Sequence, residues 1–198
     1  MSRRAATRLL LVSTLLTAGC ARSTLSVFKL VSPGPQAIAG AYTVEPRAEW
    51  SSFVDGGRLL TWTIDGAALE RLRFFGGIED GQSLVASAPA ATLGPRFVAT
   101  MTRVEVSEFV ADSLFGSVFP PRNARPASFG TAQGFRFEVS YATSDGVKRE
   151  ALVVGAVLER RLYVIAYDGT ALHHFDRYRP EVEQILASIR LTGTSAKP

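Results

Sequence analysis

The sequence holds 198 residues, of which 22 are Lys or Arg and 18 are Asp or Glu, so its formal net charge is +4. Residues 1–19 hold three of the basic residues and no acidic one, which leaves 19 basic against 18 acidic residues in the remainder. A chain this close to neutral lacks the basic surface on which nucleic-acid binding depends. With 46% apolar and 20% charged residues, the composition is that of a folded globular chain and excludes a collagen-like or wholly disordered one.

Residues 1–19 have the three parts of a secretory signal peptide. Basic residues come first, an apolar run covers residues 9–16, and small residues at 17–19 stand directly before Cys20. A membrane-spanning helix needs about 20 apolar residues, and this run reaches about half that length. We therefore predict a signal peptide over residues 1–19 rather than a permanent transmembrane helix.

The segment Leu16-Thr17-Ala18-Gly19-Cys20 resembles the lipobox of bacterial lipoproteins, although Thr17 stands where that family usually has Leu. The resemblance implies that the Cys20 thiol is acylated and that Cys20 becomes the mature N-terminus. Several acyl chains anchor a protein stably, since each buried methylene contributes about 0.8 kcal/mol. Lipoproteins retained in the inner membrane of many Gram-negative bacteria carry Asp after the cysteine. Ala21 at this position implies the periplasmic face of the outer membrane.

The cysteine content agrees with a lipid anchor. Cys20 is the only cysteine of the chain, so no internal disulfide can form, although the protein is expected to enter an oxidising compartment. A thioether to lipid would remove the exposed thiol. The alternative is an ordinary signal peptide whose cleavage site lies near a cysteine.

The composition divides the mature chain into a tether, a single domain and a tail. Residues 20–40 are rich in small residues and contain a Pro-Gly-Pro sequence, so we predict a lipidated N-terminus followed by a flexible tether, in which residues 27–31 could add a short strand. The length of residues 41–192 suits one domain with a sizeable core. Residues 193–198 are predicted to be a disordered tail.

Turn and strand signals dominate the chain beyond residue 40. Five Asp-Gly pairs, which favour tight hairpin turns, begin at positions 55, 65, 80, 145 and 168. Residues 69–75 fit either a hairpin arm or a short helix, and the hairpin is favoured. Apolar patterns predict further strands over residues 60–64, 135–141, 147–158 and 161–167. The last three of these strands are expected to form an antiparallel meander.

Two amphipathic helices are predicted. The first carries apolar residues at 106, 109, 110 and 114, and a capping box of Thr102 and Glu105 marks its start. The second carries apolar residues at 182, 185, 186 and 189, with Pro180 in its first turn. Strands that bracket one helix and precede another predict an α+β fold, a mainly antiparallel sheet with two or more helices packed on it.

From about Gly134 to Leu191, the order of a meander and a helix resembles the C-terminal part of the Mog1/PsbP-like fold. The matching positions are Phe175 before the helix, Pro180 at its start and Ser188 near its end. The resemblance implies an antiparallel sheet between helices, a sandwich used by small accessory and binding proteins. It covers under a third of the chain and consists of packing positions, so it carries over no partner-binding residue.

No recognised catalytic or cofactor-binding motif is present. The sequence lacks both Gly-x-Ser-x-Gly and Gly-x-x-x-x-Gly-Lys-Ser/Thr, and no cysteine follows Cys20. We therefore predict no catalytic residue, no cofactor and no metal, while an enzyme of unfamiliar mechanism stays open. His173 and His174 could serve metal or acid–base chemistry, but neighbours on an extended chain point apart. Packing of one ring beside Phe175 and exposure of the other are favoured.

Two charged groups and the aromatic residues remain as candidates for binding. The row Glu105, Glu108 and Asp112 on the first helix would bind a cation or a basic partner, or face solvent. Arg122 and Arg125 lie among prolines, so we predict that they belong to an exposed basic loop. The aromatic residues either fill the core or line a cleft for an apolar ligand; they are Trp50, Phe53, Trp62, Phe74, Phe75, Phe97, Phe135 and Phe137.

These patterns favour a non-enzymatic, lipid-anchored protein that faces the periplasm. Its expected partners are the membrane, through acylated Cys20, and another envelope protein or assembly. The alternative is a carrier or sensor of a small apolar or lipid-like ligand.

Overall fold

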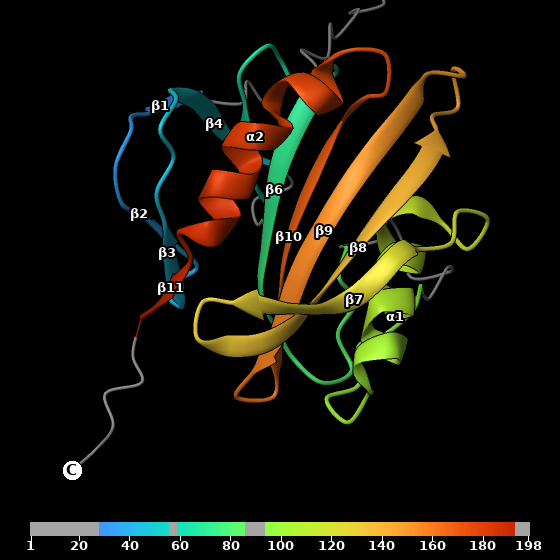
Figure 1. Ribbon diagram of the computed structural model, residues 1–198. Coiled ribbons are helices and arrows are strands. Elements are labelled where there is room, and N and C mark those ends of the chain that lie inside the picture. The colour runs from blue at the N-terminus through green and yellow to red at the C-terminus, as the bar shows by residue number, and fades with distance from the viewer. Residues whose placement is uncertain (1–27, 56–58, 86–93, 193–198) are drawn as a thin grey trace, which may run out of the picture.

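A computed structural model describes residues 28–55, 59–85 and 94–192 (Figure 1). The predicted signal peptide, Cys20 and the predicted tail at 193–198 lie outside the described residues. Their roles therefore stay predictions.

Two antiparallel sheets and two helices make up the described part of the chain. The large sheet has eight strands, in the order β1 (Lys29–Val31), β4 (Trp50–Asp55), β5 (Leu59–Thr63), β6 (Glu70–Ile78), β10 (Arg161–Thr170), β9 (Lys148–Leu158), β8 (Ala132–Ala142) and β7 (Arg122–Phe129). The small sheet has three, in the order β11 (Arg190–Leu191), β3 (Tyr42–Val44) and β2 (Gln36–Ile38). The helices are α1 (Arg103–Phe115) and α2 (His174–Ala187).

The helices cover opposite faces of the large sheet. Helix α1 packs on β7 and β8, whereas α2 packs on β6, β9 and β10, with the small sheet beside it (Figure 1). This arrangement confirms the predicted α+β fold. It also confirms the meander β8–β9–β10 and the hairpin arm predicted over residues 69–75, which is β6.

The core lies on both faces of the large sheet because its central strands are apolar on both sides. In β10, Val164 and Ala166 lie in the apolar layer under α1, whereas Ile165 and Tyr167 lie in the layer under α2. Strand β10 is flanked by β6 and β9. Its near-continuous apolar sequence therefore indicated correctly that it is a central strand.

Local signals place the start of α1 as predicted. The Thr102 hydroxyl accepts a hydrogen bond from the Glu105 backbone N–H, and the Glu105 carboxylate accepts one from the Thr102 N–H at 2.6 Å. This capping box satisfies two of the donors that a helix start leaves free. The hydrogen bond from the Thr102 backbone N–H, together with the Thr102 side chain, holds the pKa of the Glu105 carboxyl below its ordinary value.

The short strand considered at residues 27–31 is present as β1, whereas the tether predicted over residues 20–40 is wrong for residues 36–38, which form β2. The side chains of Val31 and Ile38 are buried in the core under α2. Between the two strands, the Gly34 N–H donates to the Pro46 carbonyl at 3.1 Å. The small residues gave no visible pattern because strands of three residues are too short to show alternation.

The second helix starts earlier than predicted, at His174, so Pro180 lies in its interior and not in its first turn. The start is held by Phe175, whose ring stacks on Tyr167 with centroids 5.3 Å apart. The Tyr167 hydroxyl also donates to the carbonyls of His174 and Phe175, at 2.8 and 3.0 Å. This tertiary packing outweighs the loss of one helical hydrogen bond at the proline.

Two further predictions for local structure are wrong. Arg122 and Arg125 lie in the edge strand β7 and not in a loop. The Asp168-Gly169 pair, predicted as a turn, lies inside β10. Both errors have the same cause, because turn-forming residues continue a strand when a neighbouring strand supplies their partners.

Candidate functional site

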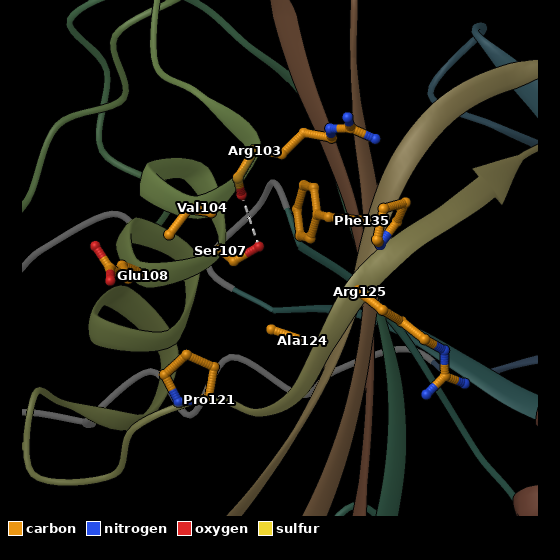
Figure 2. Close-up of a pocket in the computed structure, with 9 residues that line it drawn as sticks. Arg103, Val104, Ser107, Glu108, Pro121, Ala124, Arg125 and Phe135 are labelled. Carbon is orange, nitrogen blue, oxygen red and sulfur yellow. Dashed lines mark hydrogen bonds between the residues drawn. The ribbon is translucent and has the colours of Figure 1, made fainter.

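A groove opens between α1 and β7 on one face of the molecule. Its volume is about 400 Å³, within the range of about 300–1,000 Å³ that ligand pockets have. Figure 2 shows α1 as one wall and the segment entering β7 as the other, with Phe135 of β8 between them. The lining residues are Arg103, Val104, Ser107, Glu108, Pro121, Ala124, Arg125, Pro126 and Phe135.

The edge strand shapes this groove. The pairing of β7 with β8 shifts register between Arg122 and Arg125, and Asn123 between them has a positive φ of 54°. Such a bulge bends an edge strand. Pro126, opposite Phe135 in the ladder, offers no N–H for a further strand. This edge strand forms one wall of the groove, and its bulge and its proline disfavour the addition of a further strand there.

The bottom of the groove is apolar. Phe135 is buried there, and the Ser107 hydroxyl donates to the Arg103 carbonyl at 2.8 Å, which satisfies it within the helix (Figure 2). Val104 is 67% exposed at the mouth. A ligand that covers Val104 and contacts Phe135 would gain the free energy of removing apolar surface from water.

The charged lining residues point in different directions. Arg103 of α1 extends past one end of the groove, whereas the Arg125 side chain leaves β7 on the side away from α1 and Glu108 lies on the side of α1 away from β7 (Figure 2). None of the three makes a salt bridge with another described residue. Charges that are not engaged within the protein are available to orient a partner.

The three residues of the predicted acidic row, Glu105, Glu108 and Asp112, have different surroundings in the structure. Glu105 caps α1, Glu108 lines the groove, and Asp112 is exposed. Over residues 28–55, 59–85 and 94–192, no three His, Cys, Asp or Glu side chains come together as a metal site requires.

The two histidines lie away from the groove, at the start of α2. His173 is exposed. The Nδ1 atom of His174 lies 2.9 Å from the Thr170 hydroxyl, and its Nε2 atom lies 3.7 Å from an Asp65 carboxylate oxygen. The two rings meet edge to face with centroids 5.2 Å apart. Thr170 and Asp65 are thus the polar neighbours of His174. The sequence contains no third histidine that could join this group.

Most of the aromatic candidates belong to the core. Trp62 packs between Trp50 and Phe74, at centroid distances of 6.4 and 4.6 Å. Among the predicted cleft residues, Phe135 alone lines the described groove.

Sequence reasoning missed a buried ionic cluster, which we call the Asp168 cluster. Its members are Asp168, Arg71, Arg73, Arg149 and Tyr141. Asp168 is fully buried, and its carboxylate accepts hydrogen bonds from Arg71 Nε at 3.0 Å, Arg149 Nε at 3.0 Å and the Tyr141 hydroxyl at 2.8 Å. Arg73 Nη2 adds an ion pair at 2.9 Å.

Strand pairing assembles the Asp168 cluster. Arg71 of β6 stands directly opposite Asp168 of β10, and Tyr141 of β8 stands opposite Arg149 of β9. Burial opposes ionisation of Asp168, but attraction by the three arginines outweighs it and holds the pKa of this carboxyl below its ordinary value. The available sequence signal was the presence of arginines at inward-facing positions of apolar strands.

A second ionic group fastens α2 to the sheet. Arg136 of β8 makes a bidentate pair with Glu183 of α2, and Arg179 donates to Glu138 at 2.6 Å. These contacts pair each charge with an opposite one. The group is therefore balanced, unlike the Asp168 cluster.

Comparison with known proteins relates the chain to a few solved structures. No family model matches the chain, and no curated protein does. A crystal structure of a protein from Bacteroides thetaiotaomicron is 13% identical with a TM-score of 0.47; it matches 86% of this chain, which spans only 50% of that protein.

Two further solved structures match nearly over their whole length. LpqN of Mycobacterium tuberculosis, described as involved in cell envelope biogenesis, is 12% identical, with coverage of 87% of this chain and 88% of its own, and a TM-score of 0.39. The cyanobacterial PsbP of Synechocystis is 13% identical, with coverage of 89% and 99% and a TM-score of 0.47. No residue role is transferred from these proteins. Neither described helix is long and apolar enough to cross a bilayer.

Proposed function

We propose that this protein is a non-enzymatic accessory protein of the bacterial cell envelope. Acyl chains on Cys20 would hold it at the membrane, facing the periplasm, and the groove between α1 and β7 would bind a segment of a second envelope protein. The observation that carries the binding role is the exposed Val104 at the mouth of a groove whose bottom is Phe135.

Membrane attachment is tested at Cys20. Mass spectrometry of the membrane fraction should find a mature N-terminus at Cys20 that carries acyl chains. Cys20→Ser should abolish the acyl mass and the corresponding processing, because serine cannot form the thioether. Thr17→Leu is the matched control, since it restores the usual lipobox residue and should leave attachment intact. An unacylated Cys20, or a mature N-terminus elsewhere, would remove the lipid anchor from the proposal.

The chemistry of the groove suits an apolar segment flanked by acidic residues. Val104, Pro121 and Phe135 offer apolar contacts, and Arg103 places a positive charge at one end of the groove that would attract an acidic residue (Figure 2). Apolar anchors in a pocket, surrounded by complementary charges, are the usual arrangement of a protein interface.

Site-specific photo-crosslinking in the producing cells tests the groove. A photoreactive residue at Val104 should form an adduct with a defined envelope protein, whereas one at Leu172, which is 97% exposed and lies outside the groove, should not. With the partner purified, Val104→Asp should weaken binding at least tenfold, because it places a charge in an apolar contact. Equal adducts at both positions, or unchanged affinity of Val104→Asp, would count against a protein-binding groove.

The volume of the groove also favours a second candidate, the binding of a small amphipathic ligand. A volume of about 400 Å³ suits an apolar tail of modest size, and Arg103 suits an anionic head. Native mass spectrometry distinguishes this role. A small molecule that co-purifies with the wild-type protein and is lost from Val104→Trp, which fills the mouth, would establish ligand binding in place of protein binding.

A further inference from the structure

The Asp168 cluster carries more positive charge than its carboxylate neutralises. Three guanidinium groups surround Asp168, which leaves an excess of two positive charges. Among the described side chains, no second carboxylate pairs with these arginines. The internal segments 56–58 and 86–93 contain no acidic residue in their sequence.

The neighbouring acid in the sequence does not balance this charge. Glu70 precedes Arg71 in β6 and therefore faces the other side of the sheet. There its carboxylate accepts hydrogen bonds from the Thr63 hydroxyl and from the N–H groups of Ile64 and Asp65, at 2.6 to 2.8 Å. Glu70 is thus committed to the β5–β6 turn.

Arg73 is the least satisfied member of the cluster. Its side chain is 11% exposed. Nη2 lies 2.9 Å from Asp168, but neither Nη2 nor Nε has a hydrogen-bond partner in the described part of the chain. Asp168 also accepts hydrogen bonds from Arg71, Arg149 and Tyr141, so Arg73 shares this single carboxylate with three other donors. Buried charged donors without an acceptor cost free energy, so a further acceptor would stabilise this site.

Arg71 connects the cluster to solvent. Its side chain is 34% exposed and engages Asp168 through Nε. It also interacts with Tyr141, and its solvent-exposed part can meet a further acceptor. Arg149, in contrast, is buried and donates to the carbonyls of Ala68 and Leu69 as well as to Asp168. Arg71 is therefore the member of the cluster that an anion from solvent would meet first, with Arg73 two residues along the same face of β6.

We propose that Arg71 and Arg73 of the Asp168 cluster bind a phosphate monoester group or inorganic phosphate. Such a group carries a charge of about −1.5 to −2 at pH 7, which matches the excess of two positive charges, and it offers several acceptor oxygens for guanidinium forks. The site is separate from the groove: Tyr141 contacts Phe115 at the end of α1, whereas the groove lies along its first half.

Titration calorimetry of the full mature protein tests this site with two probes. Inorganic phosphate is compared with sodium chloride at equal ionic strength, and dihexanoyl phosphatidic acid is compared with dihexanoyl phosphatidylcholine. We expect saturable binding of phosphate, of phosphatidic acid or of both, but not of chloride or phosphatidylcholine. Binding of phosphatidic acid alone assigns a lipid headgroup, and binding of phosphate alone assigns a free ion.

Variants distinguish a built site from general surface charge. Arg71→Gln should weaken binding at least tenfold and should still fold, because this side chain is partly exposed. Arg71→Lys, which keeps the charge and loses the fork, should bind with intermediate affinity. Arg190→Gln, at an exposed arginine in β11, should bind like the wild type. Absence of binding by both probes, or an equal loss in Arg190→Gln, would overturn the proposal.

Discussion

Replacing Asp168 by asparagine is expected to lower the free energy of unfolding by about 3–5 kcal/mol, since removing one partner of a buried ion pair leaves its charges uncompensated. The carboxylate is fully buried and engages Arg71, Arg73 and Arg149. Without it, three guanidinium groups would repel one another in the apolar layer under α1. Urea denaturation in phosphate-free buffer measures the change.

The control for this substitution is Asp176→Asn, which removes an exposed carboxylate in the first turn of α2. Its effect should stay below about 1 kcal/mol. A loss of less than about 1 kcal/mol in Asp168→Asn would show that the ion pairs of the cluster contribute little to stability.

The ionisation of Asp168 is also expected to make the free energy of unfolding depend on pH. Because the folded pKa of Asp168 lies below its ordinary value of 3.8, its stabilisation is present above pH 3.8 and is lost as the pH falls through the folded pKa. The free energy of unfolding should therefore decline below about pH 4. Asp168→Asn should decline less steeply, because it has no such proton to bind.

Ile38→Ala is expected to destabilise the protein by about 2–4 kcal/mol, the usual cost of removing a large apolar side chain from a packed core. Ile38 is buried in the core under α2, although the sequence predicted a flexible tether at this position. Chemical denaturation again provides the measurement.

Leu30→Ala is the matched control for Ile38→Ala. Leu30 lies in the same predicted tether but is 67% exposed in β1, so its removal should change stability by less than about 0.5 kcal/mol. Equal, small effects of both substitutions would mean that residues 29–38 do form a tether.

Elements defined by local signals were predictable. Helix α1 begins at its capping box because Thr102 and Glu105 satisfy each other's backbone N–H groups within three residues of chain. Strands β8 and β10 were visible because strands of ten or more residues repeat their pattern often enough to be read. The start of α2 was not, because Phe175 is held by Tyr167 of the preceding strand.

The site residues were harder to predict because their partners are distant in sequence. Arg125 and Phe135 were each noted, but the groove exists only where the edge strand β7 is set against α1. Asp168 was assigned to a turn, yet its partners Arg71 and Arg149 lie 97 and 19 positions away. No local pattern records such contacts.

The sequence by itself determined the near-neutral charge of the chain beyond residue 19, the α+β class, the capping of α1 and the prediction of a lipid anchor at Cys20. These follow from composition, from periodicity and from neighbours a few residues apart. The tertiary structure alone decided that Val31 and Ile38 belong to the core, that α1 and β7 enclose a groove, and that three arginines surround Asp168. The physical reason is that strand pairing and helix packing bring together residues whose separation along the chain leaves no local trace.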